Sequence, residues 1–317
     1  MPRVSILMPS YNHARFVREA IDSVKAQTFT DWELLIADDG SKDDSMKVLE
    51  ANRSDRIHVE ANPNNIGTYA TLDRLLAKAS GDLVAILNSD DRWAPGKLER
   101  QVEMMDDYLE ATACYTLGAR VDAGGKPLGG DDHGDWPTEP LQELFPYLLE
   151  ENRVLASSVV FRSHVVRFNT ALRYSGDWIA LLRAARQGPV CCLADFLTQW
   201  RMHERNSFVR SSAQVAEEIS VRKSILSRYK STRFHRFDKE VMATHLSRCA
   251  MHLSALLVLQ GRQTEAKEAA QSAIRLNRTS EAIRRRVIVS LPSFLSRPRL
   301  WGSEEAHQPS KDIKVEI

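Results

Sequence analysis

Residues 4–45 read VSILMPSYNHARFVREAIDSVKAQTFTDWELLIADDGSKDDS and contain the pattern that decides the fold. Two apolar runs of strand type, residues 4–8 and 34–37, each end in a polar cluster and lead into a segment of helical periodicity. The pattern returns at residues 57–61 and 83–87. Alternating units of this kind build a parallel sheet, because right-handed crossovers place the carboxyl end of every strand at one edge. Ligands in open α/β sheets bind at that edge, so we expect the four polar clusters to converge on one crevice.

Composition and charge limit the class of protein. With 317 residues, 43% of them hydrophobic and 27% charged, the chain has an ordinary soluble globular composition and suffices for one large domain or two smaller ones. A net charge of +1 gives no reason to expect nucleic acid as a partner. The four cysteines lack the spacing of a metal site, which favours a reduced, cytosolic compartment. No run reaches the roughly eighteen apolar residues of a spanning helix, so any membrane contact is expected to be peripheral.

The polar residues at the strand ends suit a metal ion and a charged ligand. Asp90 follows a strand-type run, and hard divalent cations such as Mg²⁺ and Mn²⁺ take carboxylate oxygens as ligands. The alternative is that Ser89 or Asp90 only caps the next helix. Asp39 offers a carboxylate to a nucleobase or ribose, and Tyr11 offers a ring that can stack on the base. Alternatively, the Asp39–Gly40 pair only forms a turn.

These residues resemble a known family. Residues 4–45, together with residues 65–101 (NIGTYATLDRLLAKASGDLVAILNSDDRWAPGKLERQ), are similar to the opening blocks of the inverting family 2 glycosyltransferases, which use nucleotide sugars. The resemblance extends over roughly residues 3–207. It implies an α/β fold of the GT-A class, that is, a nucleotide-diphospho-sugar transferase fold with a Rossmann-like mixed sheet.

The resemblance also assigns roles to the strand-end residues. It implies that Asp90 ligates an Mn²⁺ or Mg²⁺ ion that bridges the diphosphate, with Asn88 and Ser89 near the ribose. Asn88 replaces the first carboxylate of the family's Asp-x-Asp motif, so Asp90 is the carboxylate expected to bind the ion. The pocket for uridine or another nucleoside is expected to be lined by Pro9, Tyr11, Asn12 and Asp39.

A further carboxylate opens a later helix. Transfer with inversion needs a base that takes the proton from the acceptor hydroxyl group. The family places a Glu-Asp motif at the start of such a helix; Asp177 matches its catalytic Asp, and Gly176 replaces the Glu. The alternative is that Asp177 only stabilises the helix N-terminus through its charge.

Residues 197–207, LTQWRMHERNS, resemble the closing segment of the same family. The resemblance implies that Arg201 contacts the nucleotide sugar and that His203 contacts the phosphate or the metal ion. A cationic guanidinium neutralises developing charge, and an imidazole can ligate an ion. A histidine on a loop can alternatively be structural.

The chain is expected to divide into a sheet domain and a helical region. Residues 1–210 form the sheet domain, with a nucleotide-binding half over about 1–122 and an acceptor half over about 123–210. Residues 211–302 are expected to be helical and to include one tetratricopeptide-like hairpin, which either caps the sheet domain or binds a protein partner. Residues 303–317 are predicted to be disordered.

Arg284, Arg285 and Arg286 precede an apolar stretch with Trp301 beyond it. This composition suits peripheral contact with the inner face of a membrane. The alternative is a terminal helix packed on the sheet domain.

Together the motifs predict a metal-dependent inverting glycosyltransferase. It would move a sugar from a nucleotide-sugar donor of the UDP-sugar type to a hydroxyl group of a glycan, lipid-linked or protein acceptor. The resemblance implies a role in surface polysaccharide biosynthesis. Asn88 and Gly176 support one alternative, a non-catalytic nucleotide-sugar-binding protein with a degenerate site. A nucleotidyltransferase is a second alternative, and the lack of Gly-x-Gly-x-x-Gly after Met8 argues against a dehydrogenase.

Overall fold

The computed structural model describes residues 1–130, 136–204, 211–229, 236–276 and 315. The chain folds into two compact units. The first comprises Met1–Leu144 and Arg153–Asn206, and the second comprises Phe145–Asn152 and Ser207–Ile317. The segment Phe145–Asn152 thus belongs with the C-terminal helices, whereas the sequence pattern placed it in the half over residues 123–210.

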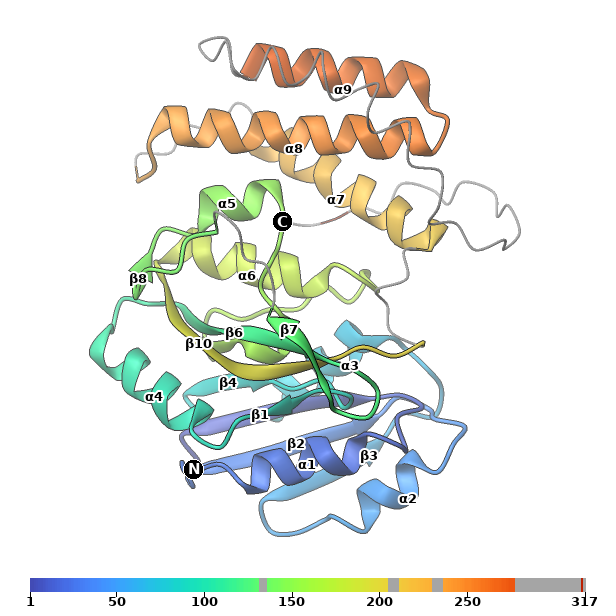
Figure 1. Cartoon of the computed structure of the whole chain (residues 1–317), viewed down its shortest axis with the longest axis vertical. Helices are drawn as coiled ribbons and strands as arrows, with labels where there is room; N and C mark the ends of the chain where they lie inside the picture. Colours follow the sequence, from blue (N-terminus) through green and yellow to red (C-terminus); the bar gives the residue numbers. More distant parts are fainter. Residues whose placement is uncertain (131–135, 205–210, 230–235, 277–314, 316–317) are drawn as a thin grey trace. The chain divides into compact units, whose positions relative to one another are not determined.

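A mixed sheet forms the first unit, and it has ten strands among the described residues. The strand order is β3-β2-β1-β4-β9-β6-β10-β5, with β7 paired to β6 and β8 paired to β10 (Figure 1). The strands are β1 (Val4–Ser10), β2 (Trp32–Asp38), β3 (Ile57–Ala61), β4 (Leu83–Ile86), β5 (Arg92–Trp93), β6 (Ala113–Val121), β7 (Pro127–Gly130), β8 (Leu141–Gln142), β9 (Val160–Arg162) and β10 (Val190–Arg201). The mixed α/β sheet confirms the predicted fold class.

The first strand marks the topological switch point of the sheet. β1 pairs in parallel with β2 on one side and with β4 on the other, and β3 lies beyond β2. The chain therefore leaves β1 in one direction and returns to its other side with β4. In open α/β sheets the crevice at the carboxyl ends of such strands is the ligand site. The residues that follow β1 and β4 meet at this point.

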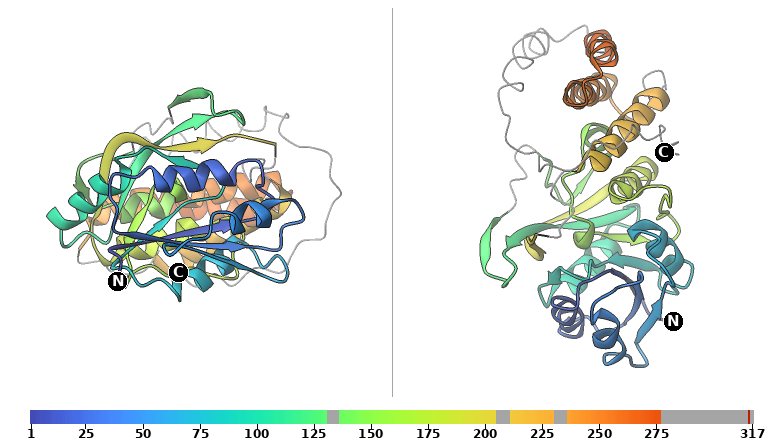
Figure 2. Two further views of the ribbon diagram at one scale, coloured as in Figure 1. Left: turned by 90° about the horizontal axis from the view of Figure 1, so that it is seen from below. Right: turned by 90° about the vertical axis from the view of Figure 1, so that its right-hand side faces the viewer.

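Helix α1 (Val17–Lys25) shows why the sequence folds in this way. It buries Val17, Ala20, Ile21 and Val24, which follow the spacing of one helix face. This face joins the core formed with alternate residues of β1, and α1 (dark blue) covers one face of the sheet (Figure 2). The remaining helices of this unit are α2 (Ser45–Glu50), α3 (Thr68–Leu76), α4 (Lys97–Asp107) and α6 (Gly176–Gln187).

Two predicted elements differ in the structure. The apolar spacing over residues 141–151 predicts a helix, but the helix begins only at Phe145, as α5 (Phe145–Glu150), because Leu141 pairs with Cys191 in the sheet. The apolar run over residues 190–193 predicts a short edge strand, but β10 continues to Arg201 and has neighbours on both sides, with β6 on one side and β8 and β5 on the other. Register shifts near Phe196 interrupt the apolar alternation, which conceals the second half of the strand from a pattern search.

The second unit is helical. It contains α5, α7 (Ser212–Tyr229), α8 (Lys239–Leu259) and α9 (Gln263–Leu276), with Gly261 at a φ of +71° in the turn between α8 and α9. Within the described part of the chain, α8 is the helix with the length and composition to cross a membrane, and 56% of that window is buried. It packs against α5, α7 and α9, as a core helix does. The basic segment at residues 284–301 lies outside the described residues, as does nearly all of the C-terminal tail.

Lys97 is a buried lysine in the first turn of α4. Its side chain is 0% exposed, its Nζ donates to Gln101 Oε1 at 2.5 Å, and it lies 4.1 Å from the centre of the Trp93 ring. Burial disfavours the charged ammonium and lowers the pKa of Lys97 to about 7. Since the unfolded chain binds this proton up to about pH 10.4, folding releases a proton between about pH 7 and pH 10.

We expect Lys97→Met to flatten the dependence of stability on pH. A lowered pKa in the folded state means that this group's contribution to stability is present at high pH and is lost as pH falls towards about 7. The wild-type free energy of unfolding should therefore rise relative to the variant's by a few kcal/mol between about pH 7 and pH 10. Urea unfolding across that range measures the difference. The exposed Lys47→Met is the control, and equal slopes in wild type and Lys97→Met would contradict the prediction.

Candidate active site

Asp90 and His203 lie together at the carboxyl edge of the sheet. Asp90 follows β4, His203 follows β10, and His203 Nε2 lies 3.1 Å from Asp90 Oδ2. Both side chains are largely buried, with 13% and 6% exposure. The structure thus brings together the two residues that the sequence suggested as metal ligands.

A third residue with a metal-ligand side chain joins them, which the sequence reasoning above did not single out. His13 follows β1, and its Nε2 lies 3.9 Å from Asp90 Oδ2. The ligand atoms of His13, Asp90 and His203 all lie within 4.8 Å of one another. The available signal was position: His13 directly follows the polar cluster after β1, at the switch point.

The donor set fits a divalent metal ion. Imidazole nitrogens and carboxylate oxygens are common ligands of such ions, and an ion needs the carboxyl group in its ionised form. Burial raises the pKa of Asp90, but the hydrogen bond to His203 and the charges of His13 and His203 outweigh it, so the pKa stays below its usual range. Asp90 is therefore available as a carboxylate.

The neighbouring Asp91 has the opposite character. Burial and the nearby charge of Asp90 raise the pKa of Asp91 to about 8. Asp91 Oδ2 accepts a 2.5 Å hydrogen bond from Ser157, and Oδ1 accepts one of 3.1 Å from the backbone N–H of Arg201. The two adjacent carboxyl groups therefore differ: the lowered pKa of Asp90 favours its ionised form, whereas Asp91 binds Ser157 and the backbone of Arg201 through hydrogen bonds.

The buried side chain of Arg201 holds the backbone of Asp90 in place. Its side chain is 1% exposed and donates to the carbonyl oxygen of Asp90 at 2.9 Å, to that of Ala123 at 3.0 Å and to Glu19 Oε2 at 2.6 Å. Its guanidinium also lies 5.0 Å from the centre of the Phe16 ring. The sequence suggested a contact with the nucleotide sugar. In the structure, the guanidinium fixes the backbone of Asp90, and the contact with the nucleotide sugar stays a prediction.

The four residues expected around the nucleoside differ in their exposure and in their contacts. Tyr11 is 42% exposed at the end of β1, where its ring is accessible, whereas Pro9 is buried within the strand. Asn12 has a φ of +54°, and its Oδ1 accepts from the backbone N–H of Lys42 at 2.7 Å. Asp39 is 3% exposed and holds a loop by accepting hydrogen bonds from Asn62 Nδ2, Ile66 N and Gly67 N.

Asn88 and Ser89 complete the loop after β4. The backbone N–H of Asn88 donates to Ser157 Oγ at 3.0 Å, and Ser89 Oγ lies 2.8 Å from His13 Nδ1. Neither Ser89 nor Asp90 caps the next helix, because α4 begins at Lys97 with Gly96 in the cap position. The capping alternative for this cluster is therefore wrong.

Asp177 lies in the first turn of α6 and is held by two donors. Its Oδ1 accepts from the backbone N–H of Trp178 at 2.8 Å and from the hydroxyl group of Tyr69 at 3.0 Å. Tyr69 comes from α3, and the sequence analysis did not single it out. A Cβ atom added to Gly176 would lie only 2.3 Å from Tyr69 Cγ. The tyrosine ring thus occupies the space that a side chain at position 176 would need.

We expect Gly176→Ala to destabilise the protein by about 1–3 kcal/mol. Helix propensity alone predicts the opposite sign, a gain of about 1 kcal/mol for replacing glycine within a helix. The clash decides the sign, because the added Cβ meets three ring atoms of Tyr69 within 2.6 Å. Urea unfolding measures the change, and Tyr69→Ala should relieve it in a double-mutant cycle. Gly96→Ala is the control, since a Cβ there meets nothing within 4 Å. A stabilised Gly176→Ala variant would contradict this account.

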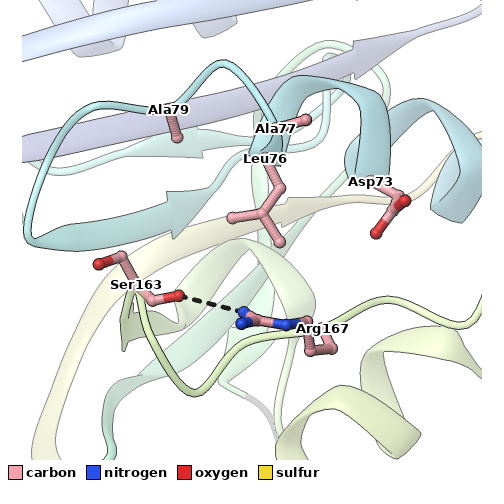
Figure 3. Close-up of a pocket in the computed structure, with 6 residues that line it drawn as sticks. All are labelled: Asp73, Leu76, Ala77, Ala79, Ser163 and Arg167. Atoms are coloured by element: carbon pink, nitrogen blue, oxygen red, sulfur yellow. Dashed lines mark hydrogen bonds between the residues drawn. The ribbon is translucent and has the colours of Figure 1, made fainter.

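A cavity of about 330 Å³ lies elsewhere in the first unit (Figure 3). Its lining comes from the end of α3 and the segment after β9: Asp73, Leu76, Ala77, Ala79, Ser163 and Arg167. Ala79 precedes β4, and Ser163 follows β9, which is antiparallel to β4. The cavity therefore lies at the amino end of β4, opposite the edge that carries Asp90.

Comparison with known proteins identifies the family of the chain. The model of the glycosyl transferase family 2 matches residues 5–168. An uncharacterized glycosyltransferase of Nostoc sp. is 40% identical over 230 residues, which are 68% of this chain and 70% of that protein. The Escherichia coli enzyme WfgD, a UDP-Glc:alpha-D-GlcNAc-diphosphoundecaprenol beta-1,3-glucosyltransferase, is 45% identical over 103 residues, or 32% of this chain. This match and those to two Bacillus subtilis relatives span 40–42% of the relatives' own length.

A solved structure shows the same fold. The structure of Staphylococcus aureus TarS 1–349 in complex with UDP-GlcNAc superimposes with a TM-score of 0.66, covering 90% of this chain and 92% of that chain. The two sequences are 16% identical, so the likeness shows the GT-A fold. The family model covers just over half of the chain, and the Nostoc relative extends the match to about two thirds of it. The protein therefore belongs to glycosyl transferase family 2.

Proposed function

We propose that this family 2 protein is a metal-dependent, inverting glycosyltransferase, and that it moves a sugar from a UDP-sugar to a hydroxyl group of a glycan or lipid-linked acceptor in surface polysaccharide biosynthesis. The observation that carries the proposal is the pairing of Asp90 with His203, 3.1 Å apart, at the switch point of the sheet. The substrates of similar proteins support the substrate classes: WfgD uses UDP-Glc and a diphosphoundecaprenol-linked acceptor, and the TarS structure contains UDP-GlcNAc.

The donor half of the reaction depends on charge at this edge. Asp90 and His203 would hold the metal ion, and a bound ion supplies Lewis-acid stabilisation of the leaving diphosphate. Arg201 keeps the backbone of Asp90 in place through its 2.9 Å hydrogen bond. Tyr11, exposed at the end of β1, offers its ring for stacking on the uracil base.

The acceptor half of the reaction needs a base. Asp177 would accept the proton of the attacking hydroxyl group, which approaches the anomeric carbon from the face opposite the diphosphate. Tyr69 and the backbone of Trp178 hold the carboxyl group through Oδ1, so its orientation is set before the acceptor arrives. Attack from that face converts an α-linked donor sugar into a β-linked product.

We place the reaction in the cytoplasm. Cys114, Cys191, Cys192 and Cys249 are all free and buried, which is consistent with a reducing compartment.

Release of UDP from a panel of UDP-sugars tests the proposal. We expect release from one donor with Mn²⁺ or Mg²⁺ and its loss with a chelator. Donor binding should be measured on the same samples by calorimetry. Binding without release would indicate that the acceptor is missing from the assay. Release that is insensitive to the chelator would contradict metal dependence, and a lack of donor binding would favour a non-catalytic protein.

A further inference from the structure

We propose that His13 is a third metal ligand, so that His13, Asp90 and His203 form a two-histidine, one-carboxylate site. Such a site selects a transition-metal ion over Mg²⁺ and Ca²⁺. The inference rests on the proposed metal-dependent transfer, because the same ion would hold the donor diphosphate. It adds to that proposal a ligand and a choice of metal.

The distances suit one shared ion. Ligand atoms held at about 2.1 Å from a common ion lie about 3–4 Å from one another in tetrahedral or octahedral geometry. His203 Nε2 and His13 Nε2 lie 3.1 Å and 3.9 Å from Asp90 Oδ2, and all three ligand atoms lie within 4.8 Å of one another. The 3.9 Å separation is too long for a hydrogen bond between those two atoms. Small rotations of the side chains would bring all three into contact with an ion.

Ser89 sets the orientation of the His13 ring. Ser89 Oγ is buried and lies 2.8 Å from His13 Nδ1. When Nδ1 carries the proton and donates to Ser89, the lone pair lies on Nε2, the ring atom near Asp90. Metal-binding histidines commonly have their second nitrogen fixed by such a hydrogen bond.

Aromatic packing holds the second imidazole. The Phe16 ring stacks on His203 with centroids 4.7 Å apart, and His13 meets the His203 ring edge-on at 5.5 Å. Both imidazoles are largely shielded, with 19% side-chain exposure for His13 and 6% for His203. Two ordered nitrogen ligands beside one carboxylate are therefore available at the same point.

The ligand types determine which ion the site favours. Mg²⁺ and Ca²⁺ prefer oxygen ligands, and Mg²⁺ usually retains several waters. Imidazole suits later transition metals, whose affinity for a given nitrogen and oxygen site increases from Mn²⁺ to Co²⁺ and Ni²⁺. A site with two imidazoles and one carboxylate should bind Co²⁺ at least about tenfold more tightly than Mg²⁺.

Metal binding to the full chain without nucleotide tests the inference. Calorimetric titrations with CoCl₂ and MgCl₂ would compare wild type with His13→Gln, and the visible absorption of bound Co²⁺ would report its coordination. We expect His13→Gln to lower Co²⁺ affinity by about tenfold or more and to change the spectrum. His58→Gln, which removes an exposed histidine on β3, is the matched control and should leave both unchanged.

A second readout does not depend on the folding of a variant. In the Co²⁺-loaded wild type, each coordinated imidazole should give one strongly shifted N–H proton resonance, and we expect two. One such resonance, unchanged Co²⁺ binding in His13→Gln, or equal affinity of the wild type for Co²⁺ and Mg²⁺ would each overturn the inference. These measurements need no sugar donor. Failure of UDP release with intact Co²⁺ binding would therefore count against the proposed transfer and not against the site.

Discussion

Replacing Asp90 with Asn is expected to lower metal-dependent UDP release by about a thousandfold or more. A metal ion contributes several kcal/mol to the stabilisation of transition-state charge, and each 1.4 kcal/mol is about tenfold in rate. Asn has nearly the same shape as Asp but lacks the negative charge. The charge matters here because Asp90 is the ionised member of the buried Asp90–Asp91 pair. Donor affinity in the presence of metal should fall as well.

The measurement compares UDP release and calorimetric donor binding in wild type and Asp90→Asn. Asp107→Asn, at the exposed end of α4, makes the same chemical change away from the site and should retain full activity. Thermal unfolding would show whether Asp90→Asn still folds. A variant that folds and keeps more than about a tenth of the wild-type rate would contradict a metal role for Asp90.

The fold was predictable because its signals are local. Apolar runs with polar ends located β1 to β4, and β3 occupies the predicted residues 57–61. Residues 122–126 (DAGGK) are typical of a hairpin turn, and they connect β6 and β7 in an antiparallel pair. The apolar pattern predicts a strand only to residue 193, although β10 continues beyond it. The second half of β10 pairs with β6 through shifted registers, where apolar and polar side chains no longer alternate regularly. Pairing that depends on distant strands leaves no periodic signal in the strand itself.

The location of the site was predictable, but the partners of its residues were not. Sequence reasoning placed Asp90 at a strand end, and topology then fixed which other strand ends meet it. It could not show that the Arg201 side chain would be buried and would donate to the carbonyl oxygens of Asp90 and Ala123. The local sequence does not distinguish an arginine that binds backbone carbonyls from one that binds phosphate. The role of Tyr69 was equally hidden, since its contact with Asp177 spans 108 residues.

Gly176 illustrates how a departure from a family pattern can be explained. In the sequence, a glycine in place of Glu indicated a degenerate site. In the structure, the ring of Tyr69 fills that space, and its hydroxyl group donates to the neighbouring Asp177. The group beside Asp177 at this point is thus a phenol that comes from another helix. Packing against Tyr69 is thus a sufficient structural reason for glycine at position 176.

Asp177→Asn is expected to reduce sugar transfer by about 10²–10⁴-fold while leaving donor affinity nearly unchanged. The amide cannot take the proton of the acceptor hydroxyl group. Its Oδ1 can still accept from Tyr69 and from the backbone of Trp178, so the first turn of α6 should keep its geometry. The loss should therefore appear in kcat for transfer, and calorimetry should give a donor Kd close to that of the wild type.

Two comparisons separate a base from a structural carboxylate. Tyr69→Phe removes the 3.0 Å hydrogen bond to Asp177 but keeps the carboxylate, so it should retain much more activity than Asp177→Asn. If Asp177 only stabilised the helix N-terminus, Asp177→Asn would cost about 0.3–1 kcal/mol of stability and leave kcat largely intact. A variant with half of the wild-type rate would thus exclude Asp177 as the base. A large loss of kcat with unchanged thermal stability and donor Kd would leave proton transfer as its role.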